Sequence, residues 1–223
     1  MTKGLFYQAI LKFMLGVVVT GILIFLPAGS FYYWNAWLLV GILFIPMFFA
    51  GIVMMLKNPE LLKKRLNAKE HQAEQNLVIK LSGLMFALGF IIAGLNFRFA
   101  WIILPDLVSW VGAAIFLLSY LLYAEILREN TYLSRTVEVQ KGQKVIDSGL
   151  YGIVRHPMYS VTMFLFFSMP LVLGSIISFA IFLTYPVIIA KRIRNEEAVL
   201  EKELDGYTEY KKKVKYRIIP CVW

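Results

Sequence analysis

The chain has 223 residues, of which 59% are hydrophobic and only 17% are charged, whereas about 25% of the residues in an average soluble domain are charged. Long apolar runs between short charged segments exclude an ordinary soluble domain and indicate an integral membrane protein. The formal net charge of +9 does not indicate nucleic-acid binding, because the Lys and Arg residues lie beside apolar runs, where anionic lipid attracts them. The single cysteine, Cys221, excludes an internal disulfide and a cysteine-based zinc site.

Four apolar runs predict membrane-spanning helices, over residues 13–27, 34–56, 78–97 and 107–127. The first helix can begin near Leu5 if the Lys12 side chain extends to the membrane surface. The segment 57–76 is expected to be a charged loop. Four aromatic residues after the first helix predict a belt at the opposite membrane surface: Tyr32, Tyr33, Trp34 and Trp37.

The basic residues are distributed unevenly between the two ends of these helices. Segments 57–76, 128–155 and 191–223 hold nineteen of the 23 Lys and Arg residues, whereas the turns at the other ends hold only Arg98. By the positive-inside rule the three basic segments are cytosolic, and so are both termini of the chain.

The apolar run 158–190 has cytosolic segments on both sides, so it is expected to enter the membrane and return. Its natural break is at Pro170–Ser175, which leaves arms of about 14 residues, or roughly 21 Å of helix. A single crossing would place the nine Lys and Arg residues of 191–223 outside. The expected fold is therefore an all-α integral membrane protein, with four transmembrane helices, a C-terminal helical hairpin and a cytosolic cap.

Arg155-His156-Pro157 stands where the hairpin begins. Proline fits the first helical position, and the free N–H groups of that turn, together with Arg155 and His156, favour an anion such as a carboxylate or phosphate. The alternative is structural: an interfacial arginine, a capping histidine and Tyr159 in an aromatic belt. Spacing alone leaves both interpretations open.

Glu196 and Glu197 stand where the return arm leaves the membrane, at the expected depth of His156. Alone, they are more typical of a solvated helix in which Glu196 pairs with Arg192, four residues away. Farther on, Tyr207 and Tyr210 are expected to share a helix face. Two roles are open for them: to cover a ring-shaped ligand or to anchor the tail.

Several common catalytic and nucleotide-binding motifs are absent from the sequence. There is no GxGxxG, no GxxxxGK[ST], no HExxH and no GxSxG. His71 stands alone in a charged segment and is expected to be solvated. A soluble Rossmann domain is thereby excluded, and no metal site is expected.

The C-terminal half resembles the isoprenylcysteine carboxyl methyltransferase and phospholipid methyltransferase group over roughly residues 107–220. The resemblance is carried by an ordered series of short motifs: Gly149-Leu150-Tyr151, Arg155-His156-Pro157-Met158-Tyr159, Glu196-Glu197-xx-Leu200, Gly206-Tyr207-xx-Tyr210 and Ile219-Pro220. Upstream, 130–134 and 137–140 resemble the bacterial members. The resemblance divides the chain into N-terminal membrane helices (1–100) and a methyltransferase core (101–223).

This resemblance implies an S-adenosylmethionine-dependent methyltransferase of the bacterial plasma membrane. It implies a lipophilic acceptor from the bilayer, either an isoprenylcysteine-like carboxylate or a lipid headgroup. It implies catalytic roles for Glu197 and Arg194. The implied cofactor-binding residues are Gln140, Val145, Gly149, Tyr151, Arg155, His156, Pro157, Tyr159, Glu196 and Glu197.

Two other functions are compatible with parts of the sequence. Membrane steroid and sterol reductases, which use NAD(P)H, share a similar His-Pro-x-Tyr element and a similar Tyr…Ile-Pro ending. Against them, Tyr159 is followed here by Ser160-Val161 rather than a Gly-Glu pair. A non-catalytic membrane scaffold would leave Arg155, His156 and Glu196 facing lipid or water without a shared pocket.

Overall fold

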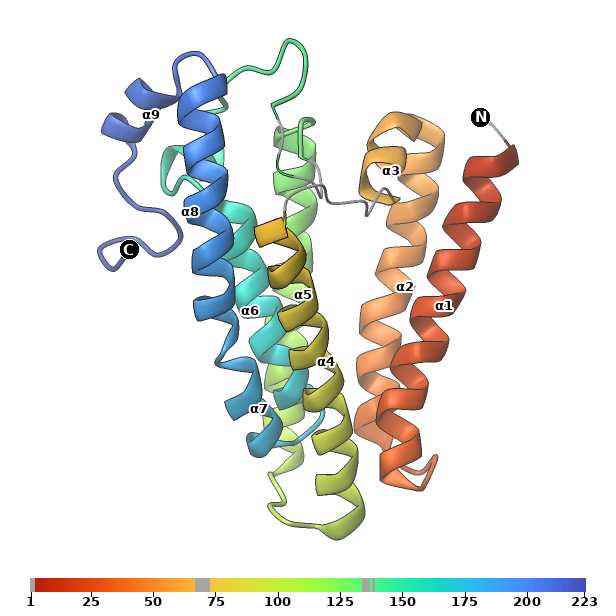
Figure 1. Cartoon of the computed structure of the whole chain (residues 1–223). Helices are drawn as coiled ribbons and strands as arrows, with labels where there is room; N and C mark the ends of the chain where they lie inside the picture. The colour runs from red at the N-terminus through yellow and green to blue at the C-terminus, as the bar shows by residue number, and fades with distance from the viewer. Residues whose placement is uncertain (1–2, 67–72, 134–136, 138) are drawn as a thin grey trace.

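A computed structural model describes residues 3–66, 73–133, 137 and 139–223. Within these residues every regular element is helical (Figure 1). The elements are α1 (Lys3–Ala28), α2 (Trp34–Lys57), α3 (Pro59–Leu66), α4 (Ala73–Phe99), α5 (Asp106–Glu129), the short 3-10 helix η1 (Gly149–Gly152), α6 (Pro157–Val172), α7 (Ile176–Phe182), α8 (Tyr185–Glu203) and α9 (Tyr207–Lys213). The prediction of an all-α protein is confirmed for this part of the chain.

In the described part of the chain, five helical stretches are long and apolar enough to cross a membrane: Gly4–Ala28, Trp34–Lys57, Gln75–Phe99, Asp106–Glu129 and Ile176–Glu203. The first four contain the four spans expected from the sequence. The chain is therefore a multi-pass integral membrane protein. The first helix extends to Lys3, beyond the expected start near Leu5, and within it Lys12 Nζ donates a hydrogen bond to the carbonyl of Leu66 at 2.5 Å.

The segment 57–76 is not simply a loop, because α3 forms inside it. Pro59 opens this helix, and the Asn58 side chain accepts a hydrogen bond from the Leu61 N–H at 3.1 Å, which caps the first turn. Leu61 and Leu62 are buried, so the charged composition concealed a short amphipathic helix. His71, Ser134 and Glu138, to which the sequence analysis also referred, lie outside the described residues.

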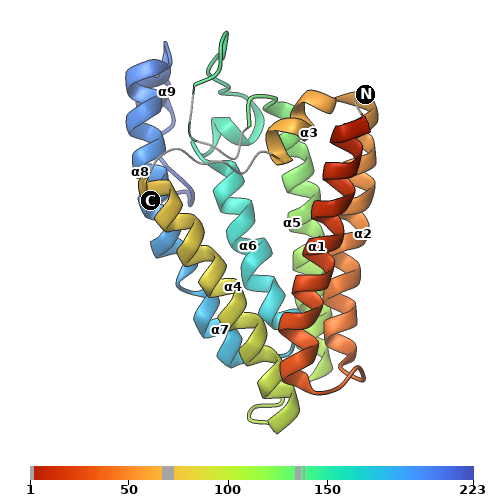
Figure 2. The same ribbon diagram turned by 45° about the vertical axis from the view of Figure 1, so that its right-hand side comes forward.

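The run 158–190 reverses direction, as expected. Helix α6 ends at Val172, Gly174 turns the chain with φ +67°, and α7 and α8 run back beside α6 (Figures 1 and 2). The left-handed backbone at Gly174 suits glycine. The arms are unequal: α6 has 16 residues, whereas Ile176–Glu203 extends over 28. The expectation of two short, equal arms was wrong, because the return helix continues through the basic residues after Ala190.

Polar side chains of α2 and the residue before it hold the hairpin turn. The Tyr33 hydroxyl donates to the carbonyl of Leu173, and Asn35 Nδ2 donates to the carbonyl of Val172 at 3.2 Å and to Ser109 Oγ at 2.8 Å. Carbonyls buried away from water need such partners. Tyr33 is only 2% exposed, so its assignment to the aromatic belt was wrong.

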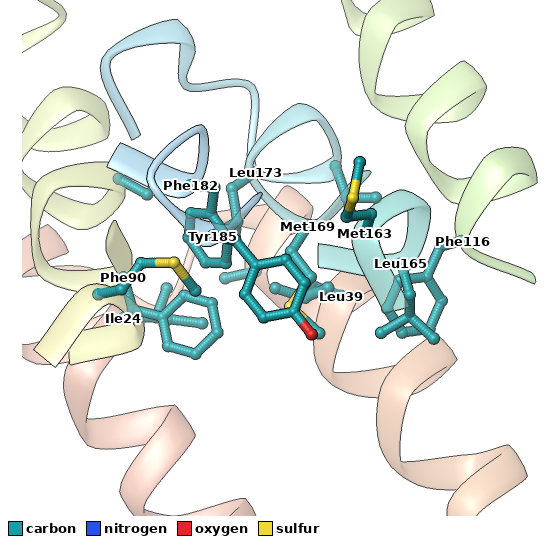
Figure 3. Close-up of a cluster of buried hydrophobic side chains, with 14 of the residues drawn as sticks. Ile24, Leu39, Phe90, Phe116, Met163, Leu165, Met169, Leu173, Phe182 and Tyr185 are labelled. Atoms are coloured by element: carbon teal, nitrogen blue, oxygen red, sulfur yellow. The ribbon is translucent and has the colours of Figure 1, made fainter. Parts of the chain in front are cut away.

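The main core surrounds α6 and joins the helices on both sides of it (Figure 3). Labelled members of this core include Ile24 of α1, Leu39 of α2, Phe90 of α4 and Phe116 of α5. Close packing is visible at Gly112, where a Cβ atom would lie 2.8 Å from the backbone nitrogen of Val172. This packing fixes the start of α6 and the polar half of α8 at the same end of the bundle (Figure 2).

Replacing Asn35 with alanine is expected to destabilise the protein by roughly 1–3 kcal/mol, because it leaves the buried Val172 carbonyl and Ser109 hydroxyl without this donor. Thermal unfolding in detergent measures the effect, with Gln8→Ala, an exposed helical position, as the matched control. Equal unfolding midpoints for the two variants would contradict the role assigned to Asn35.

Candidate functional site

A cavity lies at the end of the bundle where α6 begins and α8 becomes polar. Its volume is about 100 Å³, which is room for several water molecules or part of a ligand, so a larger ligand must move wall side chains. Its walls come from the connection before α6, from α6, from α8 and from α9. The residues that line it are Asn130, Tyr132, Leu133, Val137, Gln143, Lys144, Val145, Ile146, Tyr151, Arg155, His156, Pro157, Met158, Tyr159, Arg192, Glu196, Val199, Leu200, Leu204, Tyr207 and Tyr210.

The C-terminal tail holds the two residues that precede α6. The backbone N–H of Arg155 donates to the carbonyl of Tyr216 at 2.9 Å, and that of His156 donates to the carbonyl of Arg217 at 2.8 Å. Pro157 occupies the first turn of α6, as predicted. The backbone N–H groups around the start of α6 were expected to be free to bind an anion. Those of Arg155 and His156 donate instead to carbonyls of the tail, so fewer free N–H groups remain than expected.

Glu197 of α8 forms the centre of a buried ionic cluster. Its Oε1 accepts from Arg155 Nε at 2.8 Å and lies 3.3 Å from His156 Nε2, and its Oε2 accepts from Arg217 Nε at 2.9 Å. Glu197 is only 3% exposed. Arg155 Nη1 also donates to the carbonyls of Val214 and Lys215, at 2.7 and 2.8 Å. One carboxylate thus joins α8, the start of α6 and the tail through charge-assisted hydrogen bonds.

Glu196 is the neighbouring residue but lines the cavity. Its Oε2 accepts from the Tyr159 hydroxyl at 2.5 Å, and its Oε1 lies 3.9 Å from His156 Nδ1. The same Tyr159 hydroxyl accepts from Arg192 Nε at 2.9 Å. Arg192 and Glu196 are thereby linked through Tyr159. The carboxylate of Glu196 remains half-buried at the cavity wall, where it can attract a cation.

Three buried tyrosines complete the aromatic part of the wall. Tyr151 accepts a hydrogen bond from Asn130 Nδ2 at 3.0 Å, and Tyr210 donates to the carbonyl of Tyr151 at 2.8 Å. The hydroxyl of Tyr207 is buried and has no hydrogen-bond partner in the described structure. Burial raises the pKa of all three hydroxyls well above the usual tyrosine value, so they remain neutral. A buried hydroxyl without a protein partner on a cavity wall is placed to bind a water molecule or a polar ligand atom.

Most of the predicted site residues line this one cavity. They are Val145, Tyr151, Arg155, His156, Pro157, Tyr159 and Glu196. A scaffold would leave Arg155, His156 and Glu196 apart, whereas here they share a pocket. Glu197 lies behind the wall, in the ionic cluster.

Three further predicted residues lie away from the cavity wall. Gln140 accepts from Lys64 Nζ and donates to the carbonyl of Tyr132, both at 2.5 Å, so it connects α3 to the wall segment. Gly149 has φ +51°, and a Cβ atom there would collide with the carboxylate of Glu129, which makes its role conformational. Arg194 is exposed on another face of α8.

Arg217, which forms an ion pair with Glu197, was not among the predicted site residues. The signal available was a pair of basic residues, Lys215 and Arg217, among the apolar residues of Val214–Pro220, but nothing in the sequence shows that the tail returns to α6. The Trp223 ring supports this arginine, with the guanidinium carbon 5.0 Å from the ring centre.

The two glutamates are expected to respond differently to neutralisation. Glu197→Gln leaves Arg155 without its buried counter-charge and should destabilise the protein by roughly 3–5 kcal/mol. Glu196→Gln keeps the cluster intact and should cost less than about 1 kcal/mol. Thermal unfolding of the two variants in detergent makes the comparison, and equal losses would contradict the separation between cluster and cavity wall.

Comparisons with known proteins show which proteins the chain resembles. Residues 110–202 match the Isoprenylcysteine carboxyl methyltransferase (ICMT) family, a stretch that includes α6 and nearly all of α8. The chain is also similar to the Delta(14)-sterol reductase TM7SF2 of Mus musculus, with 34% identity over 91 residues. That similarity covers 40% of this chain and 22% of the reductase, so the chain matches less than a quarter of its relative. Residues 110–202, which include much of the cavity wall, therefore resemble the isoprenylcysteine carboxyl methyltransferase family.

Proposed function

We propose that this protein is an S-adenosylmethionine-dependent methyltransferase that methylates a lipophilic acceptor at the cytosolic surface of a membrane. The observation that carries the proposal is the cavity wall. It combines the carboxylate of Glu196 and the hydroxyl of Tyr207, which has no partner among the described residues, with aromatic side chains, in a chain whose residues 110–202 match the methyltransferase family. The proposed membrane arrangement has four transmembrane helices and a hairpin, with both termini in the cytosol, in a bacterial plasma membrane.

The chemistry of the wall fits S-adenosylmethionine. The cofactor carries a sulfonium and an ammonium cation, a carboxylate and an adenine ring. Glu196 would attract a cationic group, and Lys144, Arg155 and Arg192 are the lysine and arginine residues on the wall that could attract the carboxylate. Tyr151 and Tyr207 supply aromatic surface for the ring. The Tyr207 hydroxyl, which has no partner, would gain one.

When bound, S-adenosylmethionine supplies a methyl group that is already activated for transfer. The protein's part is to hold both reactants in position and to keep water away. Glu197 fixes Arg155 and His156, while Val199, Leu200 and Leu204 make one side of the wall apolar. The acceptor would enter from the bilayer.

The demands on the protein depend on the acceptor. A carboxylate, as in an isoprenylcysteine-like molecule, or a phosphate is already an anion and needs no base. An amine headgroup must lose a proton, and Glu196, which lines the cavity and whose Oε1 lies 3.9 Å from His156 Nδ1, would accept it. Glu197 is a poor base because both of its oxygens accept hydrogen bonds from arginines. Arg194 has no part in the proposed reaction.

A second function is favoured by one specific observation, the similarity to a sterol reductase. By this second proposal the protein is an NAD(P)H-dependent membrane reductase. The purified protein would then bind NADPH saturably and would not bind S-adenosylmethionine. The wall places the carboxylate of Glu196 among Lys144, Arg155 and Arg192, a set of both charges that suits a zwitterionic cofactor, and the binding measurement decides between the two cofactors.

Tyr207→Phe tests the cofactor site with a change of one oxygen atom. Without ligand the variant should be more stable than the wild type by about 1 kcal/mol or more, because a buried, unpartnered hydroxyl is removed. Its affinity for S-adenosylmethionine should fall by about 2- to 12-fold, the loss expected for one hydrogen bond. Calorimetric titration measures the affinity, and Tyr7→Phe, at a 70% exposed position, is the control. Unchanged affinity in Tyr207→Phe would contradict the proposed site.

Methyl transfer itself is tested with a methyl-labelled cofactor and the lipid extract of a bacterial membrane. Wild-type protein should transfer label to a lipid-soluble product, and Glu196→Gln should lower the rate at least about tenfold, because it removes a charge from the wall. Oxidation of NADPH without transfer of label would select the reductase instead.

A further inference from the structure

The face of α8 turned away from the cavity carries a second, unassigned surface groove. It is lined by Pro186, Val187, Ala190, Lys191, Arg194 and Asn195. Arg194 follows Arg192 by two residues, which is about 200° around a helix. Arg192 lines the cavity, so Arg194 and the groove point in nearly the opposite direction.

The groove changes character along the helix. Its first part is apolar, and Val187 is 77% exposed, which suits contact with lipid chains. Its second part holds two exposed cations, Lys191 and Arg194, with Asn195 beside them. From Pro186 to Arg194 the helix rises about 12 Å. The groove is thus apolar at one end and cationic at the other. A phospholipid has the same order of groups over a similar length, because its acyl chain leads to its phosphate.

Among the described residues, the two cations of the groove have no counter-charge. Lys191 and Arg194 are three residues apart and therefore adjacent on the helix surface, where like charges repel. No acidic residue lines the groove, and no ion pair joins either cation to a described residue. Glu197, three residues after Arg194, is buried and bound to Arg155 and Arg217.

We propose that this groove binds an anionic phospholipid, with its phosphate between Lys191 and Arg194 and an acyl chain along Pro186, Val187 and Ala190. The phosphate would neutralise both cations. Glu196, which lines the cavity, stands on the same helix as the groove. A phospholipid bound in the groove would therefore hold α8, and with it the cavity wall, at a constant depth relative to the lipid headgroups. The inference depends on the membrane location of α8 and not on methyl transfer, so the two proposals fail independently.

The test measures lipid retained by the purified full-length protein after incubation with mixed micelles of phosphatidylglycerol and phosphatidylcholine in equal amounts. Native mass spectrometry counts the bound lipids. Wild-type protein should retain phosphatidylglycerol in preference to phosphatidylcholine. The double variant Lys191→Gln/Arg194→Gln should lose about tenfold or more of that preference, as expected for two interfacial cations.

Two matched variants make the outcome specific. Lys57→Gln/Lys202→Gln removes the same charge at two other exposed positions and should keep the preference within about twofold. Lys191→Arg/Arg194→Lys keeps both charges and should also retain it. An unchanged preference in the glutamine pair, or an equal loss in the Lys57/Lys202 control, would overturn the proposal. Thermal unfolding of each variant establishes that it is folded.

Discussion

The buried carboxylate of Glu197 is the interaction on which the candidate site depends. A charge removed from water is tolerated only when it is paired and hydrogen-bonded, and Glu197 meets this condition with Arg155, Arg217 and His156. These partners come from the start of α6 and from the tail, whereas Glu197 lies on α8. Because each separated charge would be costly, the cluster holds three distant segments together in one arrangement.

Glu196, the adjacent residue on the same turn of α8, has a different role from Glu197. Successive residues are about 100° apart around a helix, so Glu197 faces the cluster while Glu196 faces the cavity. The first glutamate makes the site rigid, and the second supplies a negative charge to a ligand. A cavity placed on such a cluster is preorganised for a ligand that has both positive and negative groups.

The sequence predicted where the long helices lie along the chain better than it predicted the direction of each side chain. Apolar runs and the distribution of Lys and Arg predicted the long helices and the reversal near Gly174. They placed His156 and Glu196 at one level, and the structure brings both to one cavity. The direction of Arg194 was missed because the Arg192–Glu197 stretch was treated as one group without following the helical rotation.

Other parts of the site could not be read from local patterns. Gln140 and Gly149 belong to recognisable motifs, but their contacts are with Lys64 and Glu129, which are remote in sequence. The role of Arg217 depends on a tail that returns to Arg155 and His156 by backbone hydrogen bonds, and such pairing leaves no mark in composition. Helix α3 was missed because its apolar side is only Leu61 and Leu62 within a charged segment.

An experimental structure of the protein with S-adenosylhomocysteine, the demethylated form of the proposed cofactor, tests the central claim most directly. The account predicts the ligand in the cavity, in contact with Glu196 and with the hydroxyl of Tyr207, while Glu197 keeps its bonds to Arg155 and Arg217. A ligand bound elsewhere, or a Glu197 released from the arginines to contact the ligand, would contradict it.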